Sequence, residues 1–287
     1  MISLKTLKSW FSLPEIGIWT WPMWWYRERN NNNDDERDIN AIRYAIDKWI
    51  THIDTAELYA GWYSEELLWE AISIYDRNKL MINSKFMWSK GPKEIRKACE
   101  DSLKRMWINY FDVYYIHWRN KDFSLKEIIN EMENLLEDWL IKNIWVCNFS
   151  TSSLIEAQSY CKYKIPVNQV HYNLIYRQPE SDWLLKYCQE NDIFLMAWRP
   201  LELAKLANTW SPKILDIAKK YNKSNEQVAI NWLISQDNVV TIFKSSDINH
   251  INKNLWAVWW YMKSEDIEDL RENYIWKIFL SDAIPLK

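Results

Sequence analysis

Short apolar segments alternate with amphipathic segments along the chain, and this alternation limits the fold more than any other feature. A strand, a helical crossover and a further strand together build a parallel sheet, so the pattern predicts an α/β protein. The predicted strands are Ile16–Trp19, Thr51–Asp54, Leu80–Lys85, Asp112–His117, Asn143–Cys147, Val167–Val170, Phe194–Trp198 and Val239–Phe243.

Helical periodicity fills the intervals between these strands. The predicted helices are Ile39–Lys48, Glu65–Ser73, Glu94–Met106, Leu125–Glu137, Ser152–Cys161, Glu180–Asn191, Pro212–Tyr221, Glu226–Ser235, Asp247–Leu255 and Ser264–Asn273. Eight strands and 287 residues fit a (β/α)8 TIM barrel that occupies residues 1–287 as a single domain. An open doubly wound sheet is the alternative, but no glycine-rich phosphate motif follows the first strand. We interpret the polar run Asn30–Glu36 as a solvated loop.

Tryptophan occupies many positions at which a fold of this kind needs glycine. The chain has 21 Trp and 3 Gly. Trp49, Trp107 and Trp139 each follow a helical run, at the position that favours glycine because its φ is positive. We hypothesise that most of these positions are glycine in the living protein, through a UGA codon that some bacterial lineages read as glycine and a common translation table reads as Trp. An unusually Trp-rich protein is the alternative.

Charge and composition exclude several classes of function. The net charge of −3 and the pI of about 5.9 give no basic field for nucleic acid, and no run of 18 apolar residues predicts a membrane span. No signal peptide is evident, so we expect a cytoplasmic protein, and we expect it to be a monomer. The four cysteines are scattered and read as reduced thiols, and the four histidines show no metal-ligand spacing.

Four ionisable residues stand at or just after the predicted strand ends. They are Asp54, Tyr59, Lys85 and His117. In a barrel the carboxyl ends of the strands meet at one rim, where the active site lies. Free tyrosine titrates near pH 10, and a nearby ammonium lowers that pKa. Asp54 would hold Lys85 in place, and His117 would orient a carbonyl, so the set predicts protonation of a developing alkoxide.

These stretches carry a resemblance to a known family. The chain resembles the aldo-keto reductase superfamily, and within it the diketogulonate-reductase-like members. The resemblance rests on His52–Tyr59, Lys85, Tyr114–His117, Ile144–Phe149, Val167–Val170, Ala197–Leu201 and Lys244–Asn254. It implies Asp54, Tyr59, Lys85 and His117 as the catalytic tetrad, and NADPH, or alternatively NADH, lying across the barrel mouth.

The resemblance also implies which residues contact the cofactor and the substrate. Asn148 and Gln169 would bind the nicotinamide carboxamide, Trp198 would stack on its ring, and Lys244 and Ser245 would hold the phosphate on the adenosine side. The remaining implied cofactor contacts are Arg199, Leu201, His250 and Asn254, and the implied substrate contacts are Trp21, Met23 and Trp118. The family often has arginine where His250 stands, and imidazole lacks the permanent charge of guanidinium.

The resemblance divides the tryptophans into two groups. The family typically has glycine at Trp19, Trp24, Trp25, Trp49, Trp62, Trp69, Trp107, Trp139, Trp145, Trp256 and Trp259. Trp is natural at Trp21, Trp118, Trp198, Trp232 and Trp260. This division supports the recoding hypothesis independently of the argument from helix ends.

The expected function is reduction of an aldehyde or ketone to the alcohol, with hydride from the nicotinamide and the proton from Tyr59. A non-catalytic NAD(P)-binding accessory or sensor subunit of the same fold is the alternative. A third reading is that the chain as written does not fold, since strain at glycine sites approaches the total stability of a protein. Substrate choice would lie in Trp21–Asn33, Trp118–Phe123, Glu202–Trp210 and Tyr274–Lys287.

Overall fold

Eight parallel strands close into a barrel in the computed structural model, which describes residues 2–23 and 27–287. The closure depends on parallel pairing of the first and last barrel strands, with Ile16 opposite Thr241. The barrel strands are β3 (Ile16–Trp19), β4 (His52–Asp54), β5 (Met81–Phe86), β6 (Val113–Ile116), β7 (Ile144–Cys147), β8 (Val167–His171), β9 (Phe194–Trp198) and β10 (Val239–Phe243). The predicted (β/α)8 barrel is therefore confirmed, and the open sheet is not.

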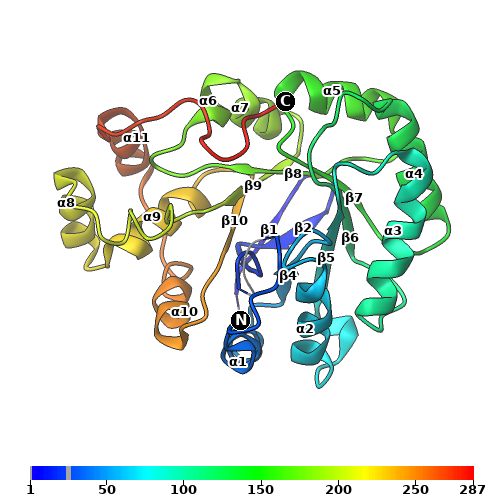
Figure 1. The fold of residues 1–287 in the computed structure, drawn as a ribbon. Coiled ribbons are helices and arrows are strands. Elements are labelled where there is room, and N and C mark those ends of the chain that lie inside the picture. The colour runs from blue at the N-terminus through cyan, green and yellow to red at the C-terminus, as the bar shows by residue number, and fades with distance from the viewer. Residues whose placement is uncertain (1, 24–26) are drawn as a thin grey trace.

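Helices surround the barrel on the outside (Figure 1). They are α1 (Asp35–Asp47), α2 (Tyr63–Ile72), α3 (Pro92–Arg105), α4 (Leu125–Glu137), α5 (Thr151–Tyr160), α6 (Gln178–Ser181), α7 (Leu184–Glu190), α8 (Pro212–Tyr221), α9 (Asn225–Ile234), α10 (Ile248–Leu255) and α11 (Ser264–Asn273), with a 3-10 turn η1 (Arg77–Lys79). Their aliphatic side chains and those of the strands form one large buried cluster. No helix among the described residues is both long and apolar enough to span a bilayer.

An antiparallel hairpin covers the amino-terminal end of the barrel, and the sequence did not predict it. Its strands are β1 (Leu4–Thr6) and β2 (Ser12–Pro14). Leu7 and Leu13 are buried in a cluster with Val113 and Val167, the first residues of β6 and β8. Because the hairpin fills this end, the opposite, carboxyl end of the strands is the one left for a site.

Two of the predicted helical segments differ from the observed ones by more than two residues at an end or in the number of helices. Helix α1 starts at Asp35, because the carboxylate of Asp34 accepts a hydrogen bond from the Arg37 amide at 3.0 Å and caps the helix. The end of the polar run Asn30–Glu36 is thus the first turn of α1. The predicted helix Glu180–Asn191 is two helices, α6 and α7, which are separated by a left-handed Trp183 with φ of 60°.

Six of the described tryptophans have a positive φ. They are Trp10, Trp49, Trp62, Trp107, Trp139 and Trp183, with φ between 48° and 72°. Trp49, Trp107 and Trp139 follow the C-caps of α1, α3 and α4, which confirms the expected positive φ at these helix ends. Trp19, Trp69, Trp145, Trp256 and Trp259 do not have a positive φ, and Trp24 and Trp25 lie outside the described residues. The five positions where Trp is natural all have negative φ.

Candidate active site

The four predicted ionisable residues meet at the carboxyl end of the barrel. Asp54 ends β4, Lys85 lies near the end of β5, His117 follows β6, and Tyr59 lies in the loop between β4 and α2. All four are buried. The ammonium of Lys85 forms an ion pair with Asp54, donates to the Thr55 carbonyl at 2.8 Å, and donates to the phenol oxygen of Tyr59 at 3.2 Å.

Gln169 of β8 completes the polar network beneath the tetrad. Its side-chain amide donates to Asp54 at 3.0 Å and to the phenol oxygen of Tyr115 at 3.2 Å. Asp54 therefore has partners at both of its oxygens, one from Lys85 and one from Gln169. This arrangement fixes the carboxylate and, through it, the position of the Lys85 ammonium beside Tyr59.

A cavity of about 200 Å³ opens above Tyr59. His117 and Cys147 line it together with three of the expected cofactor contacts, Asn148, Gln169 and Trp198. Of the three expected substrate contacts, Trp21 and Trp118 also line it. Met23 is buried and lies instead beside a different hollow, next to Lys244.

A second cavity of about 430 Å³ adjoins the first. Six of the expected cofactor contacts line it, namely Arg199, Leu201, Lys244, Ser245, His250 and Asn254. Trp19, Trp21 and Arg199 line both cavities and therefore stand between them. The two cavities together divide the expected cofactor contacts into a nicotinamide end and an adenosine end.

Comparison with known proteins decides the family. The profile of the Aldo/keto reductase family matches residues 15–275. The chain belongs to the aldo/keto reductase family. Methylglyoxal reductase YeaE of Escherichia coli (strain K12) is 32% identical over 247 residues, which are 85% of this chain and 84% of that protein. Glyoxal reductase of Bacillus subtilis (strain 168) is 34% identical over 80% of this chain and 81% of its own length.

Solved structures of family members superpose closely on this aldo/keto reductase. A thermostable aldo-keto reductase in complex with the inhibitor epalrestat has a TM-score of 0.89 and 32% identity, and the match covers 94% of this chain and 99% of that one. An aldo/keto reductase from Klebsiella pneumoniae in complex with NADP and acetate has a TM-score of 0.81 and 26% identity over the full length of both chains. Carbonyl reduction is the activity that the family name and these relatives share.

Burial and the charges of neighbouring groups act in opposite directions on the pKa values of Tyr59 and Lys85 in this aldo/keto reductase. Burial raises the pKa of Tyr59 to about 12, although the adjacent Lys85 ammonium lowers it. The expectation that the phenol titrates below its usual value is therefore wrong for the protein alone, while the direction of the lysine's effect is as expected. Burial acts to lower the pKa of Lys85, but the charges of Asp54 and Tyr59 outweigh it and raise that pKa. The lysine is thus held charged.

His117, unlike Lys85, is held uncharged. Burial, and secondarily the Lys85 ammonium, lowers the pKa of His117 well below 6.5. Its Nδ1 atom is buried and has no hydrogen-bond partner among the described residues. The ring of His117 lies 6.0 Å from that of Tyr59. A neutral imidazole beside the phenol can donate one hydrogen bond to a carbonyl oxygen without competing as an acid.

The indole of Trp19 lies against the phenol of Tyr59, and Trp19 was not predicted as a site residue. Its Nε1 donates to the Tyr59 oxygen at 2.9 Å, and its ring lies 5.9 Å from that of Trp198. Position 19 is one of those expected to be glycine, which would leave this space open. The Trp19 side chain therefore narrows the passage between the two cavities.

His171 supports the ring that would stack on a nicotinamide. The rings of His171 and Trp198 are stacked, with centroids 4.2 Å apart, and His171 is fixed by Glu202 at 2.7 Å and by Ser281 at 2.8 Å. No sequence pattern predicts this arrangement, because His171, Glu202 and Ser281 are far apart along the chain. Residues 283 and 284 of the tail also line the cavity above Tyr59, within the expected specificity segment Tyr274–Lys287.

The described residues fit an extended dinucleotide at both ends. Lys244 and Ser245 offer charge and hydroxyl at one end, and Asn148 and Gln169 offer amides at the other. Arg199 stands between them, and its Nε atom is buried with no hydrogen-bond partner among the described residues. An orphaned guanidinium donor at this position is suited to an anionic group that bridges the two cavities.

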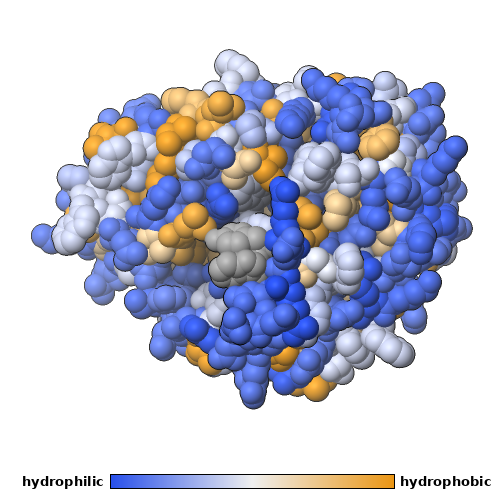
Figure 2. Space-filling model, in the orientation of Figure 1, coloured by the Kyte–Doolittle hydropathy of each residue, from blue (hydrophilic) through white to orange (hydrophobic). Residues whose placement is uncertain are grey.

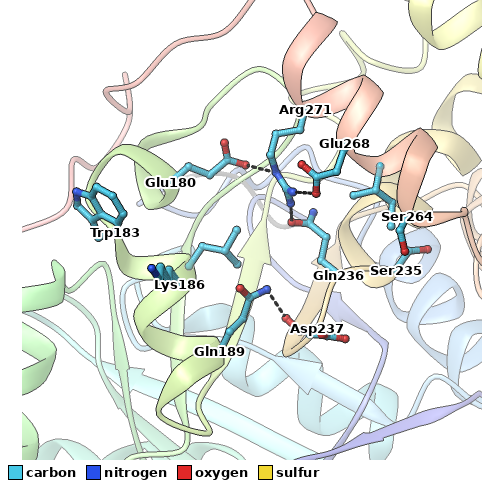
Figure 3. Close-up of a pocket in the computed structure, with 12 residues that line it drawn as sticks. Glu180, Trp183, Lys186, Gln189, Ser235, Gln236, Asp237, Ser264, Glu268 and Arg271 are labelled. Carbon is cyan, nitrogen blue, oxygen red and sulfur yellow. Dashed lines mark hydrogen bonds and ion pairs between the residues drawn. The ribbon is translucent and has the colours of Figure 1, made fainter.

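A further cavity of about 440 Å³ lies away from the strand ends, between α6–α7 and α11. Figure 3 shows Arg271 at its wall with three partners, Glu180, Glu268 and Gln236. The charged side chain that dominates this cavity is thus already paired. None of the tetrad residues lines this cavity, so it is separate from the candidate active site at the barrel mouth.

Proposed function

We propose that this aldo/keto reductase reduces an aldehyde or ketone to the alcohol with NADPH as the hydride donor and Tyr59 as the proton donor, NADH being the alternative cofactor. The observation that carries the proposal is the buried chain of contacts from Asp54 through Lys85 to the phenol of Tyr59 at the floor of a cavity. The complexes of related Klebsiella pneumoniae enzymes with NADP and with NADPH support the choice of cofactor.

The chemistry assigned to the chain is delivery of a proton and control of charge. When bound, the nicotinamide supplies the hydride. Tyr59 donates its phenolic proton to the carbonyl oxygen as negative charge develops there, and the ammonium of Lys85 stabilises the phenolate that remains. Neutral His117 donates a hydrogen bond that orients the carbonyl. Asp54 keeps Lys85 charged and in place.

We assign the cofactor contacts by the two cavities. Asn148 and Gln169 would hold the carboxamide, and Trp198, supported from behind by His171, would stack on the nicotinamide ring. Lys244 and Ser245 would hold the phosphate on the adenosine side, together with the other residues of that cavity, Leu201, His250 and Asn254. Arg199 would contact the diphosphate bridge.

Replacing Tyr59 by phenylalanine tests the proposal, because the ring stays and only the acidic proton is lost. We expect kcat for carbonyl reduction to fall by about 10²–10⁴-fold, the usual contribution of general acid catalysis, while the Kd for NADPH changes little. Tyr110→Phe is the matched control, since Tyr110 lies before β6 at the far end of the barrel. Retention of more than about a tenth of kcat in Tyr59→Phe rejects Tyr59 as the acid.

The same assay separates the enzyme from the accessory-subunit alternative. A protein that binds NADPH but oxidises it with none of a panel of aldehydes and ketones is a binding subunit.

We also propose that the chain works in the cytoplasm, and that glycine replaces Trp at the left-handed positions in the cell of origin through UGA recoding. The positive φ at six tryptophans supports this second proposal.

A further inference from the structure

Closure of the barrel places the first turn of α1 beside the loop that precedes α10. The two helices are linked directly by a hydrogen bond of 2.8 Å from the Tyr44 hydroxyl to Asn252. About two helical turns earlier, the Arg37 Nε donates to the carbonyl of Ser246 at 3.0 Å. Ser246 in turn accepts a hydrogen bond at its hydroxyl from the ammonium of Lys244 at 2.7 Å. Arg37 and Lys244 therefore share one loop residue although they are 207 positions apart.

The adenosine-end cavity does not stop at Lys244. Pro22, Lys244, Ser245 and His250 also line a hollow of about 490 Å³, and Arg37 lines this hollow too. Figure 2 shows that hydrophilic residues cover most of the surface around α1 on this face. A polar group that extends from the adenosine end past Lys244 would therefore enter a hollow with cationic groups on both sides.

Both basic and acidic side chains line this hollow, and among the described residues that line it Arg37 has free donors. Three carboxylates face it, and two of them are engaged as helix caps, Asp34 on α1 and Asp247 on α10. The third, Asp38, is buried, interacts with both Lys244 and Arg37, and accepts a hydrogen bond from Asn33 at 3.0 Å. Both cations are thus partly neutralised, but the Nη atoms of Arg37 donate no hydrogen bond to the described residues and are left to bind an anion.

We propose that Arg37 binds the ribose 2′-phosphate that distinguishes NADPH from NADH, so that the phosphate lies between Arg37 and Lys244. The proposal rests on the proposed function, because it takes the adenosine end of the cofactor to lie beside Lys244 and Ser245. Guanidinium is permanently charged and offers a pair of donors that matches two phosphate oxygens.

Calorimetric titration of the chain with 2′,5′-ADP and with 5′-AMP tests the proposal without turnover, since the two ligands differ in the 2′-phosphate. We expect Arg37→Gln to weaken binding of 2′,5′-ADP by about tenfold or more, the loss of a charged hydrogen bond, and to leave 5′-AMP within about twofold. Arg37→Lys should restore part of the loss. Arg43→Gln is the matched control, because Arg43 lies on α1 but bonds to the carbonyls of Glu70 and Ala71.

Two results overturn the proposal. Unchanged binding of 2′,5′-ADP by Arg37→Gln means that the phosphate lies elsewhere. Equal weakening of both ligands means that Arg37 merely positions the loop through Ser246. Either result can occur while the wild type still oxidises NADPH with a carbonyl substrate, and the proposed function then stands. A wild type that binds neither nucleotide and turns over no NADPH refutes both.

Discussion

Replacing the six left-handed tryptophans by glycine should stabilise the protein substantially. The change is made at Trp10, Trp49, Trp62, Trp107, Trp139 and Trp183 together. A left-handed conformation costs an ordinary L-residue about 1–2 kcal/mol, and glycine avoids this cost. Glycine in turn loses about 0.5–1 kcal/mol more conformational freedom on folding. The net gain is about 0.5–1 kcal/mol at each position.

Loss of apolar burial offsets part of this gain, most at Trp49 and Trp62, which are only 58% and 55% exposed. The strain relieved at the six positions is about 3–6 kcal/mol before that offset, against a typical total stability of about 5–15 kcal/mol. We expect the Tm to rise, by about 2–4 °C for each kcal/mol of net gain. Differential scanning calorimetry and urea unfolding measure the change.

Trp210→Gly is the matched control, since Trp210 is 85% exposed and its φ is not positive. It should leave the Tm unchanged or lower it slightly, because glycine there brings only its entropic cost. A sixfold variant that melts no higher than the wild type refutes the strain argument. The gene offers an independent check: the recoding hypothesis predicts UGA at these six codons, including Trp10 and Trp183, and UGG at Trp21, Trp118, Trp198, Trp232 and Trp260.

Three further predictions concern the site. In the reverse reaction, oxidation of the alcohol, the proposed base is the Tyr59 phenolate. Lys85→Met removes the charge that lowers the pKa of Tyr59, so the pH at which the rate rises should be higher and the reaction slower. An unchanged pH–rate profile rejects this role of Lys85. His250→Arg should strengthen NADPH binding, because guanidinium is permanently charged and can donate two hydrogen bonds to a phosphate; an unchanged Kd for NADPH contradicts this placement. Trp19→Gly should lower the Kd for NADPH, because it joins the two cavities. Trp256→Gly, a change at the exposed C-cap of α10, should leave that Kd unchanged. Equal effects of the two changes contradict the idea that Trp19 separates the cavities.

The barrel could be predicted because each of its strands is a continuous apolar run. Strands such as Phe194–Trp198 are buried on both faces, so an unbroken run of apolar residues marks where each strand begins and ends. The hairpin β1–β2 could not be found in this way, since its strands are three residues long and mostly partly exposed. The start of α1 was predicted at Ile39 instead of Asp35 for a related reason. The first turn of α1 is polar, and only the capping contact of Asp34 marks where the helix begins.

The tetrad could be predicted because each member stands next to a recognisable strand end. Tyr59 and Lys85 also belong to stretches that resemble the family. Residues that act on the site from outside those stretches left no such signal. Arg37 lies beside Lys244 and Ser246 only because α1 and α10 become neighbours, and Trp19 meets Tyr59 because β3 pairs with β4. The protonation of Tyr59 depends on burial, which a sequence does not state.

The pairing of β3 with β10 has a consequence for synthesis of the chain. The backbone of β3 is complete early, but one of its edges has no partner until Val239–Phe243 leave the ribosome. At usual translation speeds that delay is roughly 10–45 seconds. Throughout it, the nascent chain carries an apolar strand with unpaired amide and carbonyl groups, which is a template for association with other chains. Shielding of this edge by chaperones during translation should therefore govern how much of the protein reaches its closed form.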